Sequence, residues 1–136
     1  MEPLPYVDDH TLVVDAPTEA VFDAARARFE APLRGVAARY ARLVGVHGDR
    51  AFEVERAERP ALLSLAGRHR FSRYRLTFTL RTVGPGHTEL TASTHAAFPG
   101  VGGRLYKAAV IDSRAHALIM KALLRRIAAS ARPAAR

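Results

Sequence analysis

Residues 104–132 read RLYKAAVIDSRAHALIMKALLRRIAASAR and predict one long amphipathic helix. At about 100° per residue, Lys107, Arg114, Lys121 and Arg125 fall together on one side of this helix. The opposite, apolar side should be buried, and it contains Leu105, Ala108, Ala109, Ala115, Ile119, Ala122, Leu123 and Ile127.

Two polar residues, Asp112 and His116, interrupt the apolar side of the predicted helix. Because they are four residues apart, they should stack over a single turn near the middle of the buried face. An unpaired carboxylate or imidazole in a closed core costs on the order of several kcal/mol. The pair therefore indicates either a pocket that holds water or a ligand, or two residues that only satisfy each other and nearby backbone groups.

The N-terminal part predicts a strand followed by two helices. His10–Asp15 alternates with period two, and Pro17 and Glu19 then suit the first turn of a helix. A second helix is predicted over Leu33–Leu43. The buried stripe of the first helix should consist of Val21, Phe22, Ala25 and Phe29.

From Ala51 onward, apolar residues recur with period two, which predicts an antiparallel meander with one buried face. Gly84-Pro85-Gly86 marks its last hairpin turn, and the strand after it, Thr88–Phe98, carries mostly small inward residues that leave volume for another group. The inward positions of the meander are Phe52, Val54, Leu63, Leu65, Tyr74, Leu76, Phe78, Leu80, Leu90, Ala92, Thr94, Ala96 and Phe98.

Residues 12–22, LVVDAPTEAVF, resemble the entry signature of the START and Bet v 1-like superfamily, also called SRPBCC. That signature is a strand followed by Ala-Pro, two small or acidic residues, and Val with an aromatic residue. The resemblance implies a single α+β domain over residues 1–136 with the helix-grip fold, a curved antiparallel sheet wrapped around a long C-terminal helix. It also implies binding of lipids, polyketides or similar apolar molecules between sheet and helix. A polyketide cyclase-like branch of the superfamily catalyses reactions there, but no catalytic motif can be matched residue by residue.

The leading hypothesis is a protein that binds a small hydrophobic or amphipathic molecule, with Asp112 and His116 as polar contacts. The alternative is an enzyme of cyclase or dehydratase type, in which His116 moves a proton and Asp112 orients it. A third hypothesis is a regulatory or protein-interaction module with a filled core. The predicted lining consists of Tyr74, Leu76, Phe78, Leu90, Ala92, Thr94, Phe98, Leu105, Asp112, His116, Ile119 and Leu123.

The composition excludes several kinds of site. The chain has no cysteine, so disulfides, thiolate metal sites and cysteine nucleophiles are absent. The spacing of its histidines matches no metal site, so neither a metal nor another cofactor is expected. Met1–Tyr6 resembles no signal peptide, which together with the missing cysteine predicts a cytoplasmic protein. A monomer and a homodimer are both compatible with the sequence.

The net charge of +8 raises the question of an anionic partner. Nucleic acid is not expected, because the aromatic residues fall at apolar strand and helix positions. The basic side of the C-terminal helix indicates either a weak, salt-sensitive contact with an anionic membrane or a merely solvated surface. Arg68, His69 and Arg70 form a second basic segment, which either holds an anionic group of a ligand or is a solvated turn.

Overall fold

The computed structural model describes residues 4–30, 39, 43, 52–69, 72–112 and 114–132. The predicted helix over Leu33–Leu43 lies outside these residues, apart from Arg39 and Leu43. In chain order, the elements are β1 (Tyr6–Val14), α1 (Thr18–Glu30), β2 (Glu53–Glu58), β3 (Leu62–His69), β4 (Ser72–Gly84), β5 (His87–Ala97), α3 (Gly100–Lys107), the π-helical turn η1 (Ala108–Asp112) and α4 (Ala115–Ala131).

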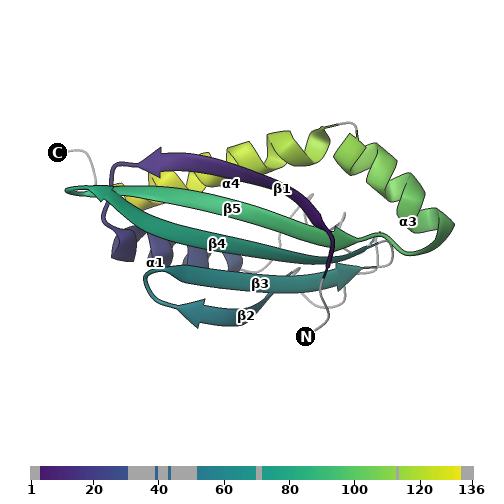
Figure 1. The fold of residues 1–136 in the computed structure, drawn as a ribbon, viewed down its shortest axis with the longest axis horizontal. Coiled ribbons are helices and arrows are strands. Elements are labelled where there is room, and N and C mark those ends of the chain that lie inside the picture. Colours follow the sequence, from purple (N-terminus) through teal and green to yellow (C-terminus); the bar gives the residue numbers. More distant parts are fainter. Residues whose placement is uncertain are drawn as a thin grey trace.

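The strands form one curved antiparallel sheet in the order β1-β5-β4-β3-β2 (Figure 1). The predicted meander accounts for β2 to β5, whose neighbours in the chain are also neighbours in the sheet. The first strand, β1, pairs with the last one, β5, and forms an edge. This pairing brings the start of the chain against residues 80 positions later, as in the contact between Thr11 and Thr91.

Strand β1 is longer than the predicted His10–Asp15, because it begins at Tyr6. Its register against β5 shifts between Tyr6 and Asp8, where one extra residue forms an irregularity of the β-bulge type. After the shift, Asp8 lies opposite Thr94.

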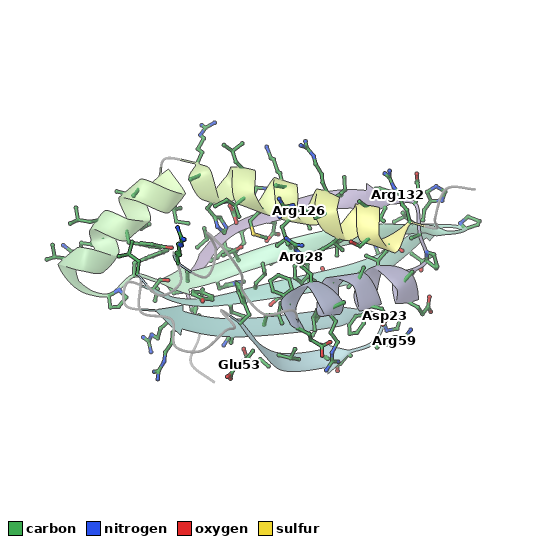
Figure 2. The ribbon with its side chains drawn as sticks, turned by 180° about the vertical axis from the view of Figure 1, so that it is seen from behind. Asp23, Arg28, Glu53, Arg59, Arg126 and Arg132 are labelled. Atoms are coloured by element: carbon green, nitrogen blue, oxygen red, sulfur yellow. The ribbon has the colours of Figure 1, made fainter. Side chains whose placement is uncertain are left out.

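Helices α1 and α4 cover one face of the sheet, behind it in Figure 1 and in front of it in Figure 2. The predicted stripe of α1 is confirmed, since Val21, Phe22 and Ala25 are buried and Phe29 packs against the core. Together with the antiparallel sheet and the C-terminal helix, this arrangement confirms the predicted α+β helix-grip fold. The core is formed chiefly by Val14, Val21, Phe22, Leu63, Leu65, Phe78, Leu90, Met120, Leu124 and Ile127.

The prediction of one continuous helix over residues 104–132 is wrong. Helix α3 already begins at Gly100, its end runs into the π-helical turn, and Arg114 then adopts a left-handed conformation with φ of 67° before α4 starts. A π-turn and a left-handed residue both change the rotation per residue from about 100°. The faces of α3 and α4 therefore cannot be derived from one helical phase.

The change of phase moves five residues of the predicted buried side to the surface, namely Leu105, Ala108, Ala109, Ile119 and Ala122. Leu105 is 69% exposed and Ile119 is 60% exposed, whereas Met120 and Leu124 are buried at 4% and 2%. The buried side of α4 is thus rotated relative to the predicted one. None of the helices among the described residues is long and apolar enough to cross a membrane.

Candidate functional site

A group of polar side chains lies on the inner face of the sheet, under the start of α4. Alternate residues of β1 point inward, and from Val14 back to Asp8 this alternation changes from apolar to polar side chains. His10 and Asp8 therefore lie on the same side of the sheet as Thr94 of β5. The first turn of α4 adds His116 from above.

The carboxylate of Asp8 connects two imidazole rings. Its Oδ2 lies 3.0 Å from Nε2 of His10, and its Oδ1 lies 3.2 Å from Nε2 of His116. The hydroxyl of Thr94 also lies 3.2 Å from Nε2 of His116. Strand β1, strand β5 and helix α4 thus meet in one hydrogen-bonded cluster, which we call the Asp8 cluster (Asp8, His10, Thr94 and His116).

The Asp8 cluster is neither sealed nor fully solvated. The side chains of His10, His116 and Asp8 are 14%, 17% and 28% exposed, and Thr94 is 6% exposed. In such a setting, a carboxylate interacts with imidazole N–H groups more strongly than it would in bulk water. The remaining exposure leaves part of the cluster in contact with solvent.

With Asp8 ionised, the contacts of His116 favour one tautomer of its ring. An ionised carboxylate can only accept a hydrogen bond, so the neutral ring then donates from Nε2. The hydroxyl oxygen of Thr94 then shares the same donor. Among the described residues, Nδ1 makes no hydrogen bond, and it is not among their buried unpaired atoms. Nδ1 therefore carries a free lone pair that can accept a proton or a hydrogen bond.

The inward orientation predicted for β3, β4 and β5 agrees with the burial, whereas Val54 of β2, also predicted to point inward, is 39% exposed at the start of a register shift. Leu76, Phe78, Leu90, Ala92 and Thr94 are all buried on the inner face. That they line a ligand site stays a prediction. Other predicted lining residues are half-buried: Tyr74 packs on Phe52, Phe98 packs on Tyr106, and Leu123 packs against the core.

The predicted positions of three site residues are not confirmed by the structure. Leu105 and Ile119 are exposed, for the reason given by the helix break, and do not face the core. The side chain of Asp112 lies outside the described residues, so its role beside His116 stays a prediction. The regular single turn predicted between Asp112 and His116 does not exist, because the left-handed Arg114 lies between them.

Sequence reasoning misses Asp8 and His10 as members of the site. The predicted strand begins at His10, and that histidine is considered only as a metal ligand. The signal is nevertheless present: Asp8, His10, Leu12 and Val14 are spaced by two, so a strand that buries the last two also turns the first two inward.

Among the described residues, His95 and Arg68 do not join this cluster. His95 lies on the outer face of the sheet, where its ring packs edge-on against Tyr6 at 5.6 Å and its Nδ1 is buried without a partner. Arg68 is exposed, and the side chain of His69 and the whole of Arg70 lie outside the described residues. Within the part of the chain that the structure describes, no group of three or more His, Asp or Glu side chains is arranged to hold a metal ion.

Comparisons with known proteins show which solved structures have a similar fold. No family model matches the chain, and no curated protein matches it by sequence. A START superfamily protein from Mycobacterium smegmatis matches 90% of this chain and 97% of its own, with a TM-score of 0.54 and 16% identity. The Zhui aromatase/cyclase from Streptomyces sp. R1128 matches 92% of this chain and 94% of its own, with a TM-score of 0.50 and 10% identity.

A third solved structure has two domains of which this chain matches one part. The di-domain aromatase/cyclase BexL from the BE-7585A biosynthetic pathway matches 90% of this chain with a TM-score of 0.57 and 19% identity, and this chain spans 45% of its length. These similarities confirm, at the level of the fold, the resemblance to the START and SRPBCC superfamily.

Proposed function

We propose that this helix-grip protein binds a small, largely apolar molecule between its sheet and α4, with one polar group of that molecule hydrogen-bonded to His116. The observation that carries the proposal is the Asp8 cluster. It places partly exposed polar side chains at the inner face of a sheet that is otherwise apolar. The fold shared with a START superfamily protein and with aromatase/cyclases supports the same location.

The free lone pair of Nδ1 suggests which polar group the molecule carries. A nitrogen that only accepts fits a hydroxyl, phenol or enol donor and repels a carboxylate. Around it, the inner-face residues Leu90, Ala92 and Phe78 provide apolar surface for the rest of the molecule. Asp8 and His10 now belong to the proposed site, whereas the exposed residues Leu105 and Ile119 do not.

Native mass spectrometry of the purified protein, followed by solvent extraction, tests occupancy directly. A stoichiometric extra mass that is lost on denaturation is expected. The variant His116→Ala should lose about fivefold in retention of the extracted molecule, since one hydrogen bond contributes about 1 kcal/mol. His87→Ala is the matched control, because His87 lies in the exposed hairpin at the other end of β5, where its ring contacts Asp15 and the backbone carbonyl of Pro85. Equal retention by both variants would contradict the assignment of His116.

A second candidate function is acid–base catalysis at the same position. The pairing of Asp8 with Nε2–H keeps the ring in one tautomer and would stabilise the imidazolium formed when Nδ1 takes a proton. Asp112, proposed from the sequence as the orienting carboxylate, would then act beside Asp8.

The two functions differ in how much His116 contributes. A catalytic His116 should lose on the order of a hundredfold or more in turnover on substitution by alanine, and Asp8→Ala should lose turnover as well. A binding site should lose only affinity in both variants. Turnover of a hydroxylated apolar substrate that survives in His116→Ala would exclude this mechanism.

A further inference from the structure

Most of the net positive charge of this protein lies in its C-terminal helical segment. Residues 100–132 contain seven of the 21 basic residues and one of the 13 acidic residues, so this segment carries a formal charge of +6 out of +8. Both lysines of the chain, Lys107 and Lys121, are among them. The charge is therefore more localised than the scatter of arginines along the sequence suggests.

The cations of this segment form no ion pair with the carboxylates that the structure describes. Elsewhere in the described chain, Arg26, Arg56, Arg59, Arg75 and Arg81 each pair with a carboxylate. None of the seven basic residues of 100–132 forms an ion pair with a described residue, and each of them is exposed. Figure 2 views the helical side and places Arg126 on α4 and Arg132 at the end of that helix. Their charge is available to an anionic partner.

Large apolar side chains are exposed in the same segment. Val101 and Leu105 of α3 are 74% and 69% exposed, and since they are four residues apart they lie on one side of the helix. Leu118 and Ile119, near the start of α4, are 67% and 60% exposed. The two helices thus offer cations and apolar side chains together.

Helix α3 is free to meet a flat surface. It extends beyond the ends of the strands in Figure 1, while α4 runs back along the sheet. Its exposed cations Arg104 and Lys107 lie next to each other on one flank of the side that carries Val101 and Leu105, with Arg104 nearer to the apolar pair. Short amphipathic helices of this composition bind in the interface of lipid bilayers, with basic residues at the headgroups and apolar ones below them.

We propose that α3 and the start of α4 dock this protein on an anionic lipid bilayer. Val101 and Leu105 enter the interface, and Arg104, Lys107 and Lys121 contact the lipid phosphates. Charge complementarity with a surface rich in anionic lipid favours this occupant, and the exposed aliphatic side chains in the same helices favour a bilayer over a nucleic acid. The docking surface is distinct from the Asp8 cluster, which lies on the inner face of the sheet.

The fluorescence of a tryptophan introduced into α3 reports the docking, because the natural sequence contains no tryptophan. In Leu105→Trp, the emission should shift to the blue on addition of phosphatidylcholine vesicles that contain roughly 30% phosphatidylglycerol, and should not shift with phosphatidylcholine alone. The matched control is Val83→Trp in β4, next to the β4–β5 hairpin turn at the far end of the sheet, where an exposed valine is replaced in the same way. Its emission should stay constant.

The contribution of charge is measured by vesicle sedimentation. Arg104→Gln combined with Lys107→Gln should reduce binding about thirtyfold, since each cation near an anionic surface contributes about a fivefold factor. Arg81→Gln, an exposed arginine next to the hairpin turn, should leave binding unchanged. Wild-type binding should weaken strongly between about 50 mM and about 300 mM salt.

Two results would overturn the proposal. One is an unshifted emission of the Leu105→Trp variant with anionic vesicles at low salt. The other is equal sedimentation of the double variant and the wild type. Tight binding to a DNA oligonucleotide or to an acidic protein, without a shift by vesicles, would assign the same cations to another partner and reject the bilayer.

Discussion

Asp8, on the first strand, accepts a hydrogen bond at 3.2 Å from Nε2 of His116, on the last helix, across 108 positions of sequence. The contact holds α4 to the edge of the sheet at the point where the helix begins. It also fixes the orientation of the imidazole, since a ring bonded at Nε2 presents Nδ1 to the other side. The carboxylate of Asp8 therefore contributes both to the attachment of α4 to the sheet and to the orientation of the imidazole at the inner face.

Removing that carboxylate should change the tautomer of His116. In Asp8→Ala, the hydroxyl of Thr94 can donate to Nε2, which allows the Nδ1–H form to become populated. The ¹⁵N chemical shifts of the imidazole ring, measured above neutral pH, distinguish the two tautomers. Asp9→Ala is the control, because Asp9 is exposed and pairs in register with Ser93 on the outer side. A wild-type ring already in the Nδ1–H form would refute the assignment.

Two leucines of α4 test the phase of that helix. Leu124 is 2% exposed and packs in the core, so Leu124→Ala should lower the free energy of unfolding by about 2–5 kcal/mol. Leu118 is 67% exposed, and Leu118→Ala should change it by no more than about 0.5 kcal/mol. Urea denaturation measures both values. Similar losses in the two variants would mean that α4 is rotated relative to the structure.

The conformation of Arg114 predicts opposite effects for one substitution at two sites. Arg114 has φ of 67°, which costs a non-glycine residue about 1 kcal/mol, so Arg114→Gly should leave the protein as stable or slightly more stable. Arg125 lies in the regular interior of α4, where Arg125→Gly should destabilise by about 1 kcal/mol. Thermal unfolding compares the two variants. A regular helix through residue 114 would instead make both substitutions destabilising.

The ion pair of Asp23 with Arg59 should make stability depend on acid pH. Arg59 donates two hydrogen bonds of 2.9 and 3.0 Å, and these lower the pKa of the Asp23 carboxyl below its usual value of 3.8 (Figure 2). A carboxyl whose pKa is lowered by folding stabilises the native state above the unfolded pKa, and this contribution is lost as the pH falls through the folded pKa.

The variant Asp23→Asn should therefore melt below the wild type at about pH 7, and the difference should shrink towards about pH 2. Glu53→Gln is the matched control, because Glu53 is exposed and pairs with no described residue. Its melting temperature should follow the wild type throughout. A difference for Asp23→Asn that is the same at both pH values would exclude the ion pair as its cause.

The periodic parts of the fold can be predicted from the sequence because one physical cause dominates them. A half-buried strand such as β4 alternates apolar and polar residues, and a helix packed on a sheet, such as α1, repeats its apolar residues every three to four positions. The break at Arg114 cannot be predicted in this way. No glycine or proline marks it, and the residues on both sides continue a helical pattern.

The candidate site can be predicted only in part. His116 stands out because a histidine interrupts an apolar stripe, but the partner that the sequence suggests for it is the nearest carboxylate, Asp112. The described partner, Asp8, depends on the pairing of β1 with β5 and on the register shift after Tyr6. Such long-range geometry leaves no periodic signal in a single sequence.

The pairing of β1 with β5 has a consequence for the order in which this protein matures. Asp8 and His10 are synthesised before the strand that receives them, and His116 follows Asp8 only 108 positions later in the chain. Strand β1 therefore has no strand to pair with while α1 and strands β2 to β4 are synthesised. A chain released before Ala115 would possess the carboxylate and lack the imidazole, so the Asp8 cluster can form only after α4 has been synthesised.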